Sequence, residues 1–281
     1  MIAICPNPFR DIDLEAAKEA AAILKAEGFE SVVCPVFAES GEAQLPPGLA
    51  YRDISSVAGD CSLAVVIGGD GTILAVARKI HDFELPLLGV NLGTKGFMAH
   101  LERDELEQIA KAARGEVKYS RRMKLDVQVL REGEVICADC ALNDAVIHGY
   151  GDCINITVSY HGDVVTAFSG DGVIASTPTG STGYSMSAGG PIVEPDAENI
   201  IISSICPHVL GARSFVLAPD KEIEIKTERL HGRRAYLSVD GNSVCDILNG
   251  DILKVRRSAR YTVMADLGNR SFFEIAYSKL I

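Results

Sequence analysis

The residues best suited to chemistry form a glycine-dense corner, Gly68-Gly-Asp-Gly-Thr72, between an apolar run and a stretch with helical character. Glycines permit positive φ and let a backbone approach a ligand closely. The N–H groups of such a corner and the N-terminus of the following helix favour phosphate oxygens. Asp70 is the only acid in the corner, and its carboxylate would orient Mg²⁺ or accept a proton from an attacking hydroxyl. The corner thus predicts phosphate binding with a base beside it; the alternative is a tight turn capped by Asp70.

The corner differs from the common phosphate-binding motifs. The chain contains no Gly-Lys pair, which excludes a Walker P-loop, and leucine at position 74 breaks the Gly-x-Gly-x-x-Gly spacing. The 38 acidic and 27 basic residues give a net charge of −11, which argues against general binding of nucleic acid or anionic membranes. An anionic ligand must therefore be held locally, by backbone N–H groups, a few basic side chains or a metal ion.

Three further polar segments are candidates for the same site. Asn91-Leu-Gly-Thr-Lys-Gly-Phe97 follows the next apolar run, so we expect it at the same sheet edge as the corner. Leu142-Asn-Asp-Ala-Val146 has two adjacent polar side chains in an apolar strand, and the inward-facing one needs a partner. Residues 169–191 are rich in Ser, Thr and Gly and offer neutral donors and acceptors suited to ribose hydroxyls, amides and a diphosphate. Each segment taken alone is equally compatible with an ordinary loop.

Alternating strand and helix signals in the first 120 residues must position the corner. The run at 63–67 is fully apolar, which is typical of a parallel sheet covered on both faces. The four expected strands are residues 2–5, 31–34, 63–67 and 87–91, and the helices are about 13–27, 73–80 and 102–113. This order predicts a doubly wound α/β domain with a mostly parallel sheet.

After about residue 120 the pattern changes to a period of two, typical of antiparallel strands. The expected strands are residues 124–130, 134–142, 155–160, 164–168, 214–217, 222–227, 234–239 and 252–256. We predict an α/β domain over 1–118, a mainly antiparallel β domain over 119–265, and a C-terminal segment, 266–281, that packs back on the first domain.

The eight cysteines indicate buried thiols in a reducing compartment, because they are scattered through mostly apolar runs. Cys137 and Cys140 form the one Cys-x-x-Cys, but residues three apart on a strand point to opposite faces and chelate a metal poorly. No targeting segment or membrane span is visible. We therefore expect a cytoplasmic protein.

Taken in order, the motifs resemble those of the NAD kinase family. They are Gly-Gly-Asp-Gly-Thr, Asn-Leu-Gly-x-x-Gly-Phe, Leu-Asn-Asp and Asp-Gly-Val-Ile-x-Ser-Thr-Pro-Thr-Gly-Ser-Thr-x-Tyr-Ser-x-Ser-Ala-Gly-Gly-Pro, within residues 60–245. The resemblance implies a kinase, a phosphotransferase with an alcohol as acceptor, that passes the terminal phosphoryl group of ATP or another donor to the 2′-hydroxyl of the adenosine ribose of NAD, giving NADP. It also implies Mg²⁺ or another divalent cation, NAD between the two domains, and a homodimer or homotetramer whose partner subunit often completes the site.

The resemblance further implies roles for individual residues. Asp70 matches the base that activates the ribose hydroxyl, and Phe97 matches the residue that packs on adenine. Asn143 and Asp144 match the pair that holds ribose and adenine groups, and Asp171 the contact to the nicotinamide end, which in some members crosses a subunit boundary. The remaining matches are Gly68, Gly69, Gly71 and Thr72 around the donor phosphates, Thr182, Tyr184, Ser185 and Ser187 along the nucleotide, and Asn242 as a polar contact on a weaker alignment.

Two departures from the family pattern are visible. Gly183 stands where alanine is usual, and Ser169-Gly170 replaces a basic residue of some members, so a charge contact to NAD is expected to be missing. Lys95 and Arg78 are the nearest basic candidates for phosphate.

Three alternatives compete with this interpretation. Lipid kinases and phosphofructokinases share the glycine corner but lack the Ser-Thr-Pro-Thr-Gly-Ser-Thr segment in this form. A non-catalytic nucleotide sensor would most simply have lost Asp70, which is present. An oxidoreductase would carry a dinucleotide fingerprint. The sequence favours the NAD kinase and leaves open the phosphoryl donor, NAD against NADH, feedback regulation, and dimer against tetramer.

Overall fold

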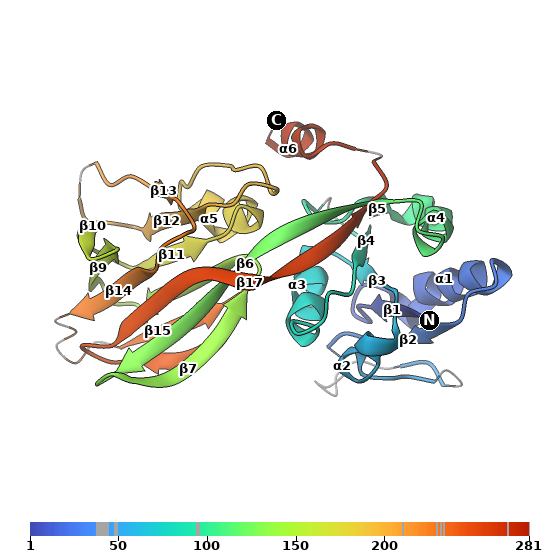
Figure 1. Cartoon of the computed structure of the whole chain (residues 1–281), viewed down its shortest axis with the longest axis horizontal. Helices are drawn as coiled ribbons and strands as arrows, with labels where there is room; N and C mark the ends of the chain where they lie inside the picture. Colours follow the sequence, from blue (N-terminus) through green and yellow to red (C-terminus); the bar gives the residue numbers. More distant parts are fainter. Residues whose placement is uncertain are drawn as a thin grey trace. The chain divides into compact units, whose positions relative to one another are not determined.

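The chain folds into two compact units (Figure 1). The computed structural model describes residues 1–37, 45–47, 50–93, 96–209, 211–228, 230, 232, 234–268 and 270–280. Unit 1 consists of Met1–Arg121 and Thr262–Ile281, and unit 2 of Arg122–Tyr261. The chain passes from one unit to the other within two long strands, β6 (Lys118–Arg131) and β17 (Ile252–Asp266).

Unit 1 is built on a parallel sheet with the strand order β2-β1-β3-β4. Its strands are β1 (Ile2–Pro6), β2 (Ser31–Val33), β3 (Leu63–Gly68), β4 (Leu87–Asn91) and the short β5 (Leu101–Glu102), which runs parallel to β4. The register pairs Gly68 with Asn91, so β3 and β4 end at the same edge. Met264 of β17 pairs with Leu87 and brings the C-terminal part of the chain to this sheet.

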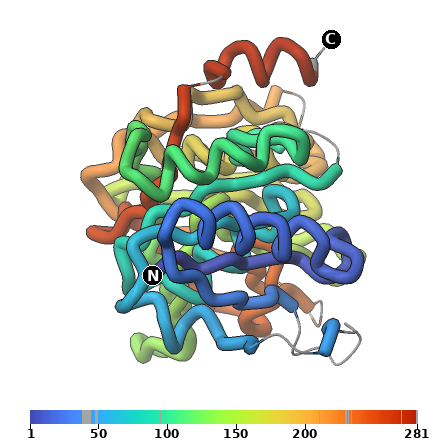
Figure 2. Tube along the Cα trace, turned by 90° about the vertical axis from the view of Figure 1, so that its right-hand side faces the viewer, coloured from blue at the N-terminus to red at the C-terminus, as the bar shows by residue number. Residues whose placement is uncertain are grey.

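Unit 1 also contains helices. They are α1 (Glu15–Ala26), α2 (Ile54–Val57), α3 (Asp70–Lys79), α4 (Ile109–Ala113) and α6 (Phe272–Leu280), with 3₁₀ turns at Ile12–Leu14, Ala58–Asp60 and Arg103–Gln108. The Asp11 carboxylate accepts hydrogen bonds from the N–H groups of Ala16 and Ala17 and so starts α1. Figure 2 shows α1, in dark blue, lying across the strands, where its small apolar face packs on β1 and β2.

Two helix predictions need adjustment. The helix after the glycine corner begins at Asp70, three residues earlier than expected, so the corner itself forms the first helical turn. The helix expected over 102–113 is a 3₁₀ segment, Arg103–Gln108, followed by only five α-helical residues. Both differences concern element boundaries, where local sequence signals are weakest.

Unit 2 contains two antiparallel sheets around one hydrophobic core. One sheet has the order β10-β9-β14-β17 with the β6–β7 hairpin beside β17, and the other has the order β13-β12-β11-β8-β15-β16. The strands not yet given are β7 (Glu134–Ala141), β8 (Asp144–Gly149), β9 (Ile154–Tyr160), β10 (Asp163–Gly170), β11 (Gly172–Ser176), β12 (Ile200–Ile205), β13 (Phe215–Leu217), β14 (Ile223–Glu228), β15 (Ala235–Val239) and β16 (Asn242–Ile247). The core includes Val127 and Ile156 from the first sheet and Ile147, Val173 and Leu237 from the second.

The predicted fold class, α/β followed by antiparallel β, is confirmed. The strands β5, β11, β12 and β16 were not expected. Of these, β11 lies inside the Ser/Gly-rich segment 169–191, and all five of its residues are buried. Within the part of the chain that the structure describes, every helix is too short or too polar to span a bilayer.

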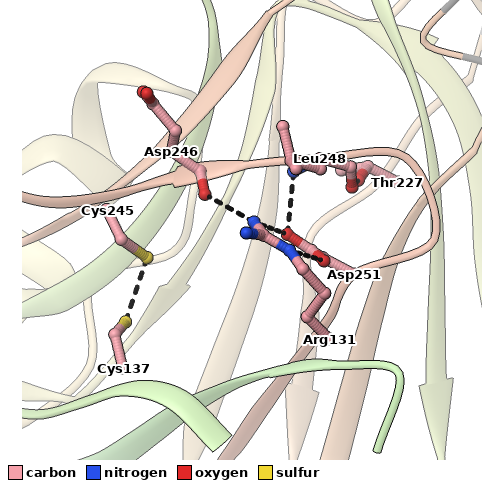
Figure 3. Close-up of polar contacts among 7 residues, drawn as sticks. All are labelled: Arg131, Cys137, Thr227, Cys245, Asp246, Leu248 and Asp251. Atoms are coloured by element: carbon pink, nitrogen blue, oxygen red, sulfur yellow. Dashed lines mark hydrogen bonds and ion pairs between the residues drawn. The ribbon is translucent and has the colours of Figure 1, made fainter. Parts of the chain in front are cut away.

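The two residues of the Cys-x-x-Cys motif point away from each other, as expected. The Cys137 thiol lies 3.0 Å from that of Cys245 on β16 (Figure 3). Cys140 is buried, and desolvation raises the pKa of its thiol, while Ser258 of β17 hydrogen-bonds to it. All eight cysteines are free thiols.

Candidate active site

The glycine corner of unit 1 depends on close packing. Strand β3 ends at Gly68, Gly69 is extended with φ −160° and ψ −173°, and α3 follows at once. A Cβ at Gly68 would lie 2.3 Å from Thr72 Oγ1, so only glycine fits there. The positive φ expected of these glycines is not used at Gly68, Gly69 or Gly71. Position 68 therefore needs glycine for space, not for backbone conformation.

Thr72 holds the corner together from within. Its side chain is 2% exposed, and its hydroxyl accepts hydrogen bonds from Asn7 Nδ2 at 3.1 Å and from the Gly69 N–H at 3.4 Å. Asn7 follows β1, and its own N–H donates to the Ile67 carbonyl. The predicted phosphate contact of Thr72 thus falls on a hydroxyl that faces the interior of the turn, where it fixes the loop after β1 to the corner.

Asp70 joins the corner to the second glycine segment. Its carboxylate accepts the Phe97 N–H at 2.8 Å and the Met98 N–H at 3.2 Å. A Cβ at Gly96 would lie 2.1 Å from Asp70 Oδ1, so the backbone of residue 96 must be bare for the carboxylate to come this close. Asp70 is half-buried. The two segments meet at one sheet edge, as the sequence predicts.

Two polar side chains extend this edge. Asn91 is 2% exposed, donates to Glu102 Oε2 at 2.9 Å and to the Gly93 carbonyl at 3.2 Å, and its Oδ1 has no hydrogen-bond partner among the described residues. The Arg10 guanidinium lies beside two glycines of this edge. Its Nη1 is 3.4 Å from a Cβ placed on Gly69 and 2.7 Å from one placed on Gly93. The sequence interpretation missed Arg10, although its position just after the first strand places it at this edge.

Phe97 follows the segment held by Asp70. The Lys279 ammonium of α6 lies 4.0 Å from the centroid of the Phe97 ring, a cation–π distance. One face of the ring that the sequence assigned to adenine is therefore covered by a side chain of unit 1 itself.

Unit 2 has a comparable corner, organised by Asp240. This residue lies between β15 and β16 with φ 47°, and its carboxylate accepts three backbone N–H groups: Leu142 at 2.8 Å, Asn143 at 2.7 Å and Asp144 at 3.0 Å. The sequence interpretation chose Asn242 near this turn and missed Asp240. Asn242 is exposed, and its amide donates to the Asp240 carbonyl at 3.2 Å.

Asn143 and Asp144 lie side by side at the start of β8. Asp144 is 6% exposed, and burial raises the pKa of its carboxyl to about 7, with a further contribution from the Asp240 charge. Asn143 Oδ1 is buried without a hydrogen-bond partner in the described chain. A Cβ at Gly183 would lie 3.4 Å from Asn143 Nδ2 and 4.0 Å from Asp144 Oδ2. The departure from alanine at 183 thus leaves space next to this pair.

The hydroxyl-rich segment packs against the same corner. Thr177 Oγ1 donates to the Leu142 carbonyl at 2.6 Å and accepts the Gly180 N–H at 3.0 Å. A Cβ at Gly180 would lie 2.2 Å from the Asn143 carbonyl oxygen, so glycine is required. Thr182 is half-buried, and its hydroxyl donates to the Thr179 carbonyl at 3.3 Å.

Tyr184 begins the short helix α5 (Tyr184–Ser187), and Asp171 lies between β10 and β11. The exposed Tyr184 ring stacks on His148 at 5.6 Å, and His148 stacks on Tyr236 at 5.1 Å. Desolvation raises the pKa of the Tyr184 phenol, and the charges of Cys206, Tyr236, Asp171 and Asp144 add to the effect. Asp171 is exposed and hydrogen-bonds to the Cys206 thiol, whose pKa it raises. Tyr184 therefore lies close enough to Asp144 and Asp171 for their charges to act on its phenol.

Two family models match almost the whole chain. The ATP-NAD kinase N-terminal domain matches residues 2–117, and the ATP-NAD kinase C-terminal domain matches residues 142–267. The chain belongs to the ATP-NAD kinase family. Membership in this family makes it an NAD kinase-type phosphotransferase and excludes the lipid kinase and phosphofructokinase alternatives.

Curated NAD kinases are similar along most of their length. The NAD kinase of Geobacter sulfurreducens is 40% identical over 83% of this chain and 82% of its own length. That of Lachnoclostridium phytofermentans is 38% identical over 82% and 84%, and that of Lachnospira eligens 34% identical over 99% and 98%.

Solved structures of the family share the fold. Yeast NADH kinase in complex with NADH superposes with a TM-score of 0.83 at 26% identity, over 97% of this chain and 84% of that one. An NAD kinase from Archaeoglobus fulgidus in complex with ATP gives a TM-score of 0.76 at 24% identity, over 100% and 98%, which is a likeness of fold.

The remaining residues assigned by NAD kinase resemblance occupy different surroundings. Ser185 is fully buried, and its hydroxyl lies 3.2 Å from that of Ser203, so it supports the short helix α5 (Tyr184–Ser187) from inside. Ser187 is exposed. Arg78 lies in the last turn of α3, at the far end from the corner, and Lys95 lies outside the described residues.

Proposed function

We propose that the chain transfers the terminal phosphoryl group of ATP to the 2′-hydroxyl of the adenosine ribose of NAD, giving NADP, with Asp70 as the base. The observation that carries the proposal is the Asp70 carboxylate. It belongs to the first residue of α3, within the glycine corner, and its oxygens accept hydrogen bonds from two backbone amides. Family membership supplies the acceptor, NAD.

The start of α3 supports binding of the donor phosphates. The helix has ten residues, and its N-terminus carries a partial positive charge and N–H groups without intrahelical partners. Among the described residues, no atom outside the backbone of α3 lies within 4 Å of a Cβ built on Gly71. Phosphate oxygens can approach the first turn at Gly71 without displacing a described side chain.

Asp70 carries the proton in the proposed reaction. The ribose 2′-oxygen attacks the γ-phosphorus, its proton passes to the Asp70 carboxylate, and the bond to the β–γ bridging oxygen breaks to release ADP. The amides of Phe97 and Met98 fix the orientation of the carboxylate and leave lone pairs for the incoming hydroxyl.

Residues of unit 2 would bind NAD. Asn143 offers a buried, unpaired amide oxygen, and Asp144 has a pKa near 7, so at neutral pH it donates or accepts a hydrogen bond to a ribose or adenine group. Tyr184 and Asp171 are exposed and suit the nicotinamide end. The other proposed contacts are Phe97 through the ring face that Lys279 leaves, and Thr182, Ser187 and Asn242.

Mg²⁺ would accompany the donor. Among the described residues there is no cluster of three or more His, Cys, Asp or Glu side chains suited to a metal. This fits Mg²⁺, which usually keeps several waters and is held by one or two carboxylates plus substrate phosphates. Asp70 is the carboxylate at the donor end. From the family resemblance we further infer a cytoplasmic homodimer or homotetramer, whose mass light scattering would give.

The function is tested by incubating the protein with NAD, ATP and Mg²⁺ and following NADP with an NADP-specific dehydrogenase. We expect NADP, and we expect EDTA to abolish its formation until excess Mg²⁺ is added. Parallel reactions with other triphosphates, polyphosphate and NADH define the donor and acceptor. Absence of NADP with every donor would refute the proposal.

A further inference from the structure

Arg10 lies in a loop that is anchored to the glycine corner. The Arg10 N–H donates to the Asn7 carbonyl at 2.9 Å, and Asn7 in turn bonds to the Ile67 carbonyl and to Thr72. The backbone that carries the guanidinium is therefore fixed relative to β3 and the start of α3. A ligand at the corner therefore lies within reach of this side chain.

The Arg10 guanidinium borders both glycine segments. Its Nη1 lies 3.4 Å from a Cβ built on Gly69 and 2.7 Å from one built on Gly93, and these glycines flank the two segments joined by Asp70. The side chain is exposed, and no hydrogen bond or ion pair joins the guanidinium to another described residue. A permanently charged, five-donor group thus stands unengaged beside the corner.

A cavity of about 670 Å³ opens next to this arginine. It is lined by Arg10, Asn91 and Gly93 on the side of the sheet edge, and by Arg103 and acidic residues farther out. Asn91 is 2% exposed and its Oδ1 lacks a partner within the described chain, so a second polar group at this edge awaits a ligand or water.

The charges around the cavity restrict where an anion can bind. Asp11, Glu15, Glu102 and Asp104 line its outer part and repel phosphate. The guanidinium of Arg103 is bound to Glu19 at 2.5 Å. Favourable positions for a phosphate are therefore confined to the corner side, between Arg10 and the start of α3.

We propose that Arg10 binds the polyphosphate of the nucleoside triphosphate donor at the glycine corner. The inference rests on the proposed kinase function and deepens it by naming the cation of the donor site. The forked guanidinium pairs with two phosphate oxygens at once, and it supplies positive charge in a chain of net charge −11. We assign to Arg10 the role that the sequence suggested for Arg78, which lies eight helical positions, or about 12 Å, beyond Asp70.

The test compares Arg10→Met, Arg10→Lys and Arg103→Met. In steady-state assays with saturating NAD and Mg²⁺, Arg10→Met should lower kcat/KM for ATP by about 10- to 100-fold, the size expected for a lost charge-assisted phosphate contact, and leave KM for NAD within twofold. Arg10→Lys should recover part of the loss, because lysine keeps the charge without the fork. Arg103→Met, a matched change in the same cavity, should alter neither parameter more than about twofold.

Direct binding separates this inference from the proposed function. Calorimetric titration of Mg²⁺ with a non-hydrolysable ATP analogue into the wild type and Arg10→Met requires no turnover. Weaker binding to Arg10→Met alone supports the assignment. Equal binding to both proteins, or equal losses in Arg10→Met and Arg103→Met, would overturn it even if the enzyme forms NADP.

Discussion

The two units position their polar corners with the same device but divide the work differently. In unit 1, Asp70 accepts two backbone N–H groups, from Phe97 and Met98, and the same carboxylate is the proposed base. In unit 2, Asp240 accepts three N–H groups, from residues 142–144, and the neighbouring Asp144 is the carboxyl available for a ligand. In unit 1 a single carboxylate thus holds the backbone and is the proposed base. In unit 2 Asp240 holds the backbone, and Asp144 is available to a ligand.

This division explains the environments of the acids. Asp240 has a full set of donors, so its negative charge is stabilised by hydrogen bonds. Asp144 is buried beside that charge, its carboxyl makes no hydrogen bond to another described residue, and burial raises its pKa to about 7. In unit 2 the backbone is held by Asp240, so a second acid, Asp144, can remain partly protonated at neutral pH. In unit 1 one carboxylate, that of Asp70, holds the backbone and is also the proposed base.

The largest effect is expected for Asp70→Asn. Loss of the base should lower kcat by roughly 10²- to 10⁴-fold. Because one oxygen becomes an NH₂ group that faces a backbone N–H, the segment 96–98 should also loosen. Gly96→Ala provides the matched comparison, since it pushes that segment away and keeps the carboxylate. If Asp70→Asn and Gly96→Ala reduce kcat equally, Asp70 acts by positioning and the base role is wrong.

Asp144→Asn should change the pH dependence of stability. The folded pKa, about 7, is higher than the unfolded value, about 3.9, so the folded protein binds the extra proton. The wild type therefore has its full contribution below about pH 4 and loses it as the pH rises through 7. The variant lacks this loss and should be more stable by about 2–4 kcal/mol at pH 8, and nearly equal at pH 4.

Thermal unfolding of both proteins from pH 4 to pH 9 measures this difference. Parallel curves for the wild type and Asp144→Asn at every pH would show that Asp144 is ionised in the folded state at neutral pH. Asp144 would then be charged, and the proposed difference between Asp240 and Asp144 would be wrong.

Asp240→Asn should act on NAD binding and stability more than on chemistry. The amide keeps one acceptor oxygen, so at least one N–H of residues 142–144 loses its partner, which costs about 1–3 kcal/mol of unfolding free energy. We expect KM for NAD to rise several-fold, with kcat reduced far less than in Asp70→Asn. A variant with unchanged KM for NAD and a large loss of kcat would reverse the assignment of the two units.

The smallest effect is expected for a carboxylate that only holds structure. Asp251 is 2% exposed and accepts two hydrogen bonds from Arg131, at 2.9 and 2.8 Å, and one from the Leu248 N–H at 2.8 Å (Figure 3). Arg131 is about one-third exposed, and Arg131→Ala should lower the melting temperature, because Asp251 loses two of its hydrogen bonds. Kinetic constants should stay within twofold of the wild type. A larger change in KM for NAD would show that the region around Arg131 and Asp251 affects NAD binding.

Local patterns were enough to predict the glycine corner and the two fold classes. The run 63–67 and the glycines after it define a buried strand that turns into a helix, and both signals lie within ten residues. By contrast, Asp240 acts on residues that precede it by 96 to 98 positions, and in the sequence Val-Asp-Gly it resembles any hairpin turn. Strand β11 was hidden because its neighbours are typical of loops.

Arg10 was missed for a related reason. Nothing in Asn7-Pro-Phe-Arg10 indicates a ligand site, and its relevance follows only from the parallel pairing of β1 with β3. The sequence did contain a usable signal, since chain segments that leave parallel strands share one edge. The rule that places the segments after the third and fourth strands at this edge also places residues 7–10 there.

The contact between Asp70 and the amides of residues 97 and 98 also constrains how this enzyme can diverge. Asn91 is fixed by its pairing with Gly68. Phe97 is fixed by its hydrogen bond to the carboxylate of Asp70, which lies two positions after Gly68. Both ends of this five-residue bridge are thus fixed, so an insertion or deletion between them would shift the amides from Asp70. Homologous chains should therefore tolerate changes of side chain in this bridge, apart from Gly96, while its length stays constant.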